Sequence, residues 1–193
     1  MSTTADPSSQ APAFVPLEAN PELMTNLLHT LGLSRSLAVH DVYSLTEPSL
    51  LAFIPRPAHA LLLVFPVSAA YESHRLAEDA TVAVPLGPDE RARLLERDPA
   101  LAAAHQSAAE QGDTAAPAAT DDVDLHYVCF VKGRDGALWE LDGRRKGPLR
   151  RGDLDSSEDV LSEKALALGP LKFLEREAAD LRFSCVALAG SLD

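Results

Sequence analysis

The 193-residue sequence contains only two cysteines, Cys129 and Cys185, and each lies within an apolar stretch. Two isolated thiols do not form the disulfide framework of a small secreted domain, which favours a reducing compartment. Residues 1–10 also lack the basic and apolar regions of a secretory signal. We therefore expect a cytoplasmic protein.

Basic residues are also scarce. The chain has 17 Lys and Arg against 29 Asp and Glu, which gives a net charge of −12. Such a surface repels nucleic acid and anionic lipid and favours a basic partner. The longest apolar run, residues 58–67, is far shorter than the roughly 20 residues of a membrane span. We expect neither a nucleic-acid partner nor a membrane partner.

The apolar fraction of 46% is ample for one hydrophobic core. Residues 1–13 are rich in Ser, Thr, Ala and Pro, which predicts a disordered leader before one domain over residues 14–193. Residues 99–122 are again mostly small or polar. This segment is predicted to be a long irregular loop.

Local patterns predict helices and strands in irregular alternation. Asn20 and Pro21 open a helix that ends at Gly32, and a later helix, capped by Ser156 or Ser157, is expected to break at Gly169 and Pro170. Further helices are expected at 47–53, 71–79 and 88–97, and strands at 38–43, 59–67 and 181–188. The fold class is α+β, with a mainly antiparallel central sheet flanked by helices.

Residues 124–131 and 138–143 read as a hairpin around a Gly-rich turn. His126 and Asp142 interrupt its apolar runs and stand directly opposite each other if an odd loop is centred on Arg134. Such partners lie roughly 4.5–5.5 Å apart at Cβ, close enough to hydrogen-bond. From the residues alone, the pair is either a structural contact or the base and orienting acid of a catalytic triad.

Several blocks, in order, resemble the ubiquitin C-terminal hydrolases, which are papain-like cysteine peptidases. The resemblance covers nearly everything after residue 13. Its densest parts are Val123-Asp124-Leu125-His126 and Glu140-Leu141-Asp142-Gly143, which are similar to the motifs of the catalytic His and Asp. The other blocks are Pro16-Leu17-Glu18-Ala19-Asn20-Pro21, Leu31-Gly32-Leu33, Asp41-Val42-Tyr43, Pro55-Arg56-Pro57, residues 61–66, Tyr71-Glu72, Asp89-Glu90-Arg91-Ala92-Arg93, Glu110-Gln111-Gly112-Asp113-Thr114 and Leu181-Arg182-Phe183.

The resemblance implies that His126 is the general base and that Asp142 orients it. It also implies that a crossover loop straddles the site, and that ubiquitin or a ubiquitin-like protein is the partner of a monomer. No cofactor and no metal are implied. The residues expected to face ubiquitin are Pro16, Leu17, Glu18, Ala19, Asn20, Pro21, Gln111, Gly112, Asp180, Leu181, Arg182 and Phe183.

The sequence departs from the family after Tyr71-Glu72. The helix that carries the family's oxyanion glutamine and nucleophilic cysteine has no counterpart before Asp89-Glu90. Cys129 is three residues after His126 and points to the other face of its strand, and Cys185 has the context of a buried core thiol. The loss is expected to expose apolar surface on residues 61–65 and to leave a groove or an unfolded edge.

The family therefore suggests a thiol-dependent hydrolase that removes small adducts from the ubiquitin C-terminus, in protein catabolism, whereas this chain lacks the nucleophile and is expected to be catalytically impaired. The alternatives are a ubiquitin-binding pseudo-enzyme and a shortened splice or gene-model product. The structural expectations are that His126 and Asp142 face each other on adjacent antiparallel strands and that no sulfur lies within reach of His126.

Overall fold

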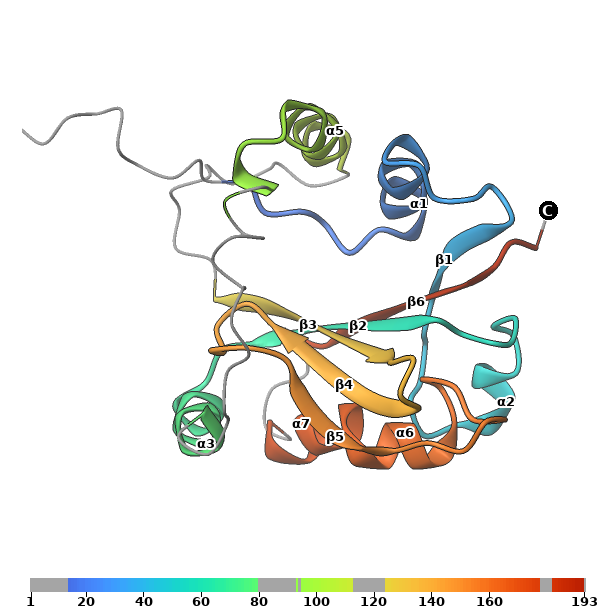
Figure 1. Ribbon diagram of the computed structural model, residues 1–193, viewed down its shortest axis with the longest axis vertical. Helices are drawn as coiled ribbons and strands as arrows, with labels where there is room; N and C mark the ends of the chain where they lie inside the picture. Colours follow the sequence, from blue (N-terminus) through green and yellow to red (C-terminus); the bar gives the residue numbers. More distant parts are fainter. Residues whose placement is uncertain (1–13, 80–92, 94, 113–123, 178–181, 193) are drawn as a thin grey trace, which may run out of the picture.

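The computed structural model describes residues 14–79, 93, 95–112, 124–177 and 182–192. These residues form three layers, with a central sheet between two groups of helices (Figure 1). Helices α1 (Pro21–Thr30) and α5 (Pro99–Glu110) lie on one side. Helices α3 (Ala69–Asp79), α6 (Glu163–Leu168) and α7 (Pro170–Arg176) lie on the other, and α2 (Pro48–Leu51) lies near one end of the sheet.

The sheet contains six strands in the order β1-β6-β2-β3-β4-β5, and every neighbouring pair is antiparallel. The predicted α+β class with an antiparallel sheet is confirmed. The last strand of the chain lies between the first two, so β6 joins distant parts of the sequence. The strands are β1 (Leu37–Asp41), β2 (Ala60–Pro66), β3 (Leu125–Lys132), β4 (Ala137–Asp142), β5 (Leu149–Asp153) and β6 (Ser184–Gly190).

One face of the sheet, called here the closed face, carries the main hydrophobic core. On β2 the side chains of Leu61, Leu63 and Phe65 are at most 1% exposed, because α3, α6 and α7 cover them. Val128 and Phe130 of β3 continue this face and are fully buried. His126 lies two residues before Val128 and therefore belongs to the closed face.

The other face, called here the open face, is less completely covered. Leu62 and Cys129, which stand opposite each other on β2 and β3, are only partly buried. Helix α1 packs mainly on the edge strand β1 and on α5. It begins as predicted, with the Asn20 side chain accepting bonds from two backbone amides, yet none of its residues is buried.

The predicted break between two C-terminal helices is confirmed. Gly169 ends α6, and Pro170 is the first residue of α7, where a missing N–H costs nothing. A Cβ atom at Gly169 would lie 2.5 Å from the Phe130 ring, so only glycine allows this close approach. The predicted start was wrong, because Ser162, rather than Ser156 or Ser157, caps α6.

Two other predictions need correction or fall outside the described residues. Residues 99–110, expected to be irregular, form α5, because Asp98 caps the helix, Pro99 opens it and its alanines favour it. The strand over Leu149–Asp153 was not predicted, because Arg150, Arg151 and Gly152 hide its pattern. Residues 88–92 and 94 of the helix expected at 88–97, and residues 113–122 of the expected loop, lie outside the described parts, whereas residues 93, 95 and 96 are helical.

Candidate active site

His126 and Asp142 meet at one end of the sheet. His126 Nε2 lies 2.6 Å from Asp142 Oδ1, and the two side chains are 14% and 0% exposed. An ionised carboxylate can only accept, so Nε2 carries the proton and donates it. The other ring nitrogen, Nδ1, has no hydrogen-bonding partner among the residues that the structure describes. The carboxylate thus fixes the tautomer and leaves one basic nitrogen available.

The predicted register of this hairpin was wrong by two positions. Val128, not His126, stands opposite Asp142. The turn is centred on Asp135 rather than Arg134, because the Asp135 carboxylate accepts the Ala137 amide. An even shift keeps every side chain on its face, so His126 and Asp142 are diagonal neighbours that still touch.

Tyr71 holds the second carboxylate oxygen of Asp142. Its hydroxyl reaches over from α3 and donates to Oδ2 at 2.5 Å, while the Arg144 amide donates to Oδ1 at 2.8 Å. Burial opposes ionisation of Asp142, but the bonds from His126, Tyr71 and Arg144 outweigh it and hold the pKa of this carboxyl below its ordinary value. Burial, and then the bond to Asp142, raise the pKa of Tyr71. No local sequence pattern indicates the contact between Tyr71 and Asp142.

A buried ion-pair network fixes α3 against the sheet. Arg145, whose side chain is fully buried, contacts Glu140 of β4 and Glu78 of α3, each at 2.7 Å. Arg151 of β5 contacts the same two carboxylates. Because Glu78 and Tyr71 share α3, this network also places Tyr71 beside Asp142. Glu140 and Asp142 alternate with apolar residues on β4, a pattern that could have indicated inward-facing charge.

Neither cysteine is placed to work with His126. Cys129 lies on the open face, whereas His126 lies on the closed face. Cys185 stands opposite Leu63, two strands away from β3, which puts its Cα roughly 12 Å from that of His126. Burial raises the pKa of the Cys129 thiol to about 11 and raises the pKa of the Cys185 thiol further. Both thiols are therefore neutral at physiological pH, and neither contacts His126.

Two segments predicted to face ubiquitin, residues 16–21 and the described part of 180–183, meet at the His126 end of the sheet. The Tyr127 hydroxyl donates to the Leu17 carbonyl at 2.5 Å, which anchors residues 14–20 over the open face. Arg182 pairs with Asp124 at 2.6 Å. Phe183 stacks on Phe65, whose ring also contacts that of His126. Within residues 16–21, Asn20 and Pro21 begin α1.

The remaining predicted residues are not shown at this end. Gln111 and Gly112 follow α5, and the Gln111 amide donates to Ser107 Oγ within that helical segment. The structure shows no contact of these two residues with His126. Asp180 and Leu181 lie outside the described residues, so their predicted role stays a prediction.

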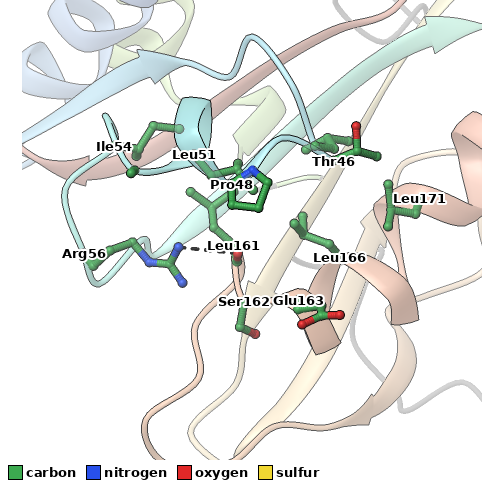
Figure 2. A pocket seen from close by; sticks show the side chains of 12 residues that line it. Thr46, Pro48, Leu51, Ile54, Arg56, Leu161, Ser162, Glu163, Leu166 and Leu171 are labelled. Atoms are coloured by element: carbon green, nitrogen blue, oxygen red, sulfur yellow. Dashed lines mark hydrogen bonds between the residues drawn. The ribbon is translucent and has the colours of Figure 1, made fainter.

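A separate cavity of about 690 Å³ lies between α2 and α6 (Figure 2). Its walls are mostly apolar, and Arg56 at its rim already pairs with Asp159 and donates to the Leu161 carbonyl. It contains no base next to a nucleophile. Across the described parts of the chain, no cluster of His, Cys, Asp and Glu could hold a metal ion. Within the same parts, no helix has the length and apolar character that crossing a membrane requires.

Comparison with known proteins decides the family. The model of "Ubiquitin carboxyl-terminal hydrolase, family 1" matches residues 14–84 and 76–168. The chain is 30% identical to the ubiquitin carboxyl-terminal hydrolase of Drosophila melanogaster, covering 92% of this chain and 98% of that one. It is 32% identical to the enzyme of the same name from Aplysia californica, over 85% and 96% of the two chains. This chain belongs to that family.

Solved structures of the family share the fold. The UCH37 catalytic domain of Trichinella spiralis, bound to ubiquitin vinyl methyl ester, superposes with a TM-score of 0.64 at 18% identity. The superposition covers 93% of this chain and 97% of that one. At this identity the likeness shows the architecture alone.

The alignments also show that relatives contain residues without a counterpart here. The Drosophila alignment has 228 positions, and 92% of this 193-residue chain amounts to about 178 of them. About 50 positions of the alignment therefore contain no residue of this chain. The family match divides into two segments that overlap at residues 76–84, between the start of α3 and α5.

Proposed function

We propose that this chain is a ubiquitin-binding member of its family that has lost thiol-dependent hydrolysis. The observation that carries the proposal is the position of the two thiols. Cys129 lies on the opposite face of the strand that carries His126, and Cys185 lies two strands away and is partly buried. His126 and Asp142 retain the geometry of a general base and its orienting acid, but no thiol contacts the imidazole.

Several features support ubiquitin, or a ubiquitin-like protein, as the partner. The chain belongs to a family named for ubiquitin, and the superposed Trichinella structures contain ubiquitin vinyl methyl ester. Leu17, Arg182 and Phe183, which are among the residues expected to contact ubiquitin, lie at the His126 end of the sheet. The net charge of −12 suits the basic C-terminal tail of ubiquitin.

Two assays on the purified full chain test the proposal. Hydrolysis of a fluorogenic amide at the ubiquitin C-terminus is expected to be absent, and calorimetric titration with ubiquitin is expected to show saturable heat. Turnover that thiol alkylation abolishes would refute the loss of catalysis. The absence of heat at millimolar protein would refute binding.

A charge reversal locates the binding surface. Arg182→Glu changes an exposed residue beside Asp124 and is expected to weaken ubiquitin binding, whereas Lys164→Glu changes a similarly exposed residue of α6 and is expected to leave it unchanged. Equal affinities of the two variants would contradict the proposed surface.

We also propose, as the second explanation, that the chain is a shortened product of a gene whose full product contains the additional segment. The roughly 50 unmatched positions and the division of the family match at residues 76–84 favour it. Sequencing of the transcript between the codons for Tyr71 and Asp89 tests it. A continuous genomic reading frame with no intervening sequence would exclude a splice form.

A further inference from the structure

An apolar groove lies between α1, the entry segment 14–17 and the open face of the sheet. It consists of two cavities of about 260 and 480 Å³ that share Met24 and Leu62. Leu28, Cys129 and Val186 line the first, and Val64 and Leu17 line the second. We call these joined cavities the open-face groove. A groove was expected after the loss of a helix, but on residues 61–65 as a whole, whereas Leu61, Leu63 and Phe65 are buried on the closed face.

The lining of the groove carries no charge at neutral pH. Burial lowers the pKa of His105, raises that of Cys129 to about 11 and raises that of Tyr127 to about 12. The imidazole, the thiol and the phenol are therefore all uncharged. An occupant that brings no charge pays no desolvation cost here, and a charged one does.

The walls of the groove behave as an incomplete core. Helix α1 points Met24, Leu27 and Leu28 toward the groove, yet it has no buried residue, and α5 packs on α1 rather than on the sheet. Sheet residues Leu62 and Leu188 remain only partly buried. Two helices and a sheet direct apolar side chains toward the same space. These side chains can be fully buried only if another apolar element fills that space.

The dimensions and the topology indicate a helix. The groove follows β2 from Ala60 to Val64, roughly 13 Å of strand, which equals about two and a half helical turns. The family model matches in two segments that overlap at residues 76–84, and α3 and α5 lie on opposite sides of the sheet. About 50 positions of the Drosophila alignment contain no residue of this chain, which is ample length for such a helix.

We propose that the open-face groove binds, in trans, an apolar α-helix of about two and a half turns supplied by a second polypeptide. The helix presents apolar side chains to α1, to residues 14–17 and to the sheet, which line the groove. Binding buries Leu62 and Cys129 and completes a second core. The proposal rests on family membership and on the shape of the groove, and it does not require ubiquitin binding.

The probe is a synthetic peptide with the sequence of the Drosophila relative that aligns with no residue of this chain, with each cysteine replaced by serine and a fluorescein at its N-terminus. Anisotropy with the full chain is expected to show saturable 1:1 binding, and circular dichroism is expected to show a gain of helix. A scrambled peptide of equal composition is expected not to bind. Equal binding of the two peptides, or binding of neither, would overturn the proposal.

Matched variants test the location. Leu62 and Leu141 flank Cys129 in one cross-strand row, but Leu141 lines neither cavity. Leu62→Lys is expected to weaken peptide binding at least about tenfold, and Leu141→Lys to leave it unchanged. If near-UV circular dichroism shows that Leu62→Lys is unfolded, Leu62→Trp, which fills the groove without a charge, replaces it. Equal affinity of the Leu62 and Leu141 variants would place the peptide elsewhere.

Cys129 provides an independent readout. In a Cys185→Ala background it is the only thiol of the chain, and its reaction with the neutral reagent 4,4′-dithiodipyridine is expected to slow at least about tenfold when the peptide is saturating. Unchanged reactivity would exclude the groove as the site. A dimer of the chain alone that the peptide fails to dissociate would also overturn the proposal, since the occupant would then be a second copy. Ubiquitin titration of the same variants reports separately on the proposed function.

Discussion

The two faces of the sheet differ in how completely they are covered. On the closed face, α3, α6 and α7 pack over Leu63 and Phe65, and a buried ion-pair network joins α3 to β4 and β5. On the open face, α1 and α5 leave a groove over Leu62 and Cys129. The two faces of β2 thus differ, because one contributes to a fully buried core and the other to a partly buried one.

The residues that orient His126 belong to the better covered side of the sheet. Everything that orients His126 lies on the closed face or at its edge, including Tyr71 and Asp142, and it is intact. The open face is the less completely covered one, and the Drosophila alignment has about 50 positions that contain no residue of this chain. The contact between His126 and Asp142 therefore depends on the closed-face layer, and neither thiol of the chain contacts the imidazole.

The largest effect is expected from the buried ion pairs of the closed face. Arg145→Met leaves the buried Glu140 with one cationic partner fewer and is expected to destabilise the chain by about 3–5 kcal/mol. Arg150→Met removes a half-exposed pair with Asp153 and is expected to cost less than about 0.5 kcal/mol. Urea unfolding followed by Trp139 fluorescence measures both. Similar values would show that the network does not hold the closed face.

Neighbouring leucines on β2 compare the faces directly. Leu63→Ala empties a site in the closed core and is expected to cost about 2–5 kcal/mol, whereas Leu62→Ala removes atoms that already border a cavity and is expected to cost about 1 kcal/mol. The same urea experiment gives both values. If Leu62→Ala proved as costly as Leu63→Ala, the open face would be as well packed as the closed one.

The next effect is a pH dependence that arises from Asp142. Its folded-state pKa lies below the ordinary 3.8, so its contribution to stability is fully present above that value and is lost as the pH falls through the folded-state pKa. Asp142→Asn is expected to cost about 1–3 kcal/mol at pH 7 and to flatten the loss of stability below pH 4. Urea unfolding across pH 2–7 measures it, with the exposed Asp153→Asn as the control. An unchanged acid slope would contradict the depressed pKa.

The sequence alone supported much of the closed-face architecture. The apolar runs of β2 and β3, the Asn20 cap of α1 and the break at Gly169 each follow from local rules, and the structure confirms them. The contact between His126 and Asp142 was also predictable. Its register was not, because the side-chain bond of Asp135 that shifts the turn is invisible in a list of turn-forming residues.

Most features that the sequence did not predict depend on contacts between residues far apart in the chain. Tyr71 reaches Asp142 across 71 positions, and Glu78 reaches Arg151 across 73, so no local pattern indicates either contact. The helix over 99–110 was missed because an alanine-rich, low-complexity composition fits both a loop and a helix, and the Asp98-Pro99 cap decides between them. Strand β5 was missed because the charged residues Arg150 and Arg151 interrupt the apolar pattern that indicates a strand.

The smallest expected effect concerns the two thiols, and it tests whether either of them works with His126. If neither thiol serves His126, Cys129→Ala and Cys185→Ala each leave ubiquitin affinity unchanged, and the reaction of Cys129 with 4,4′-dithiodipyridine rises about tenfold per pH unit from pH 7 to 9, because its pKa lies near 11. Cys185, which is more deeply buried, is expected to react more slowly. A thiol that reacts fast at neutral pH, with a rate already at its plateau, would instead be a thiolate paired with an imidazolium. That result would require a rearrangement that brings a strand across the sheet, and it would restore the chain to the active members of the family.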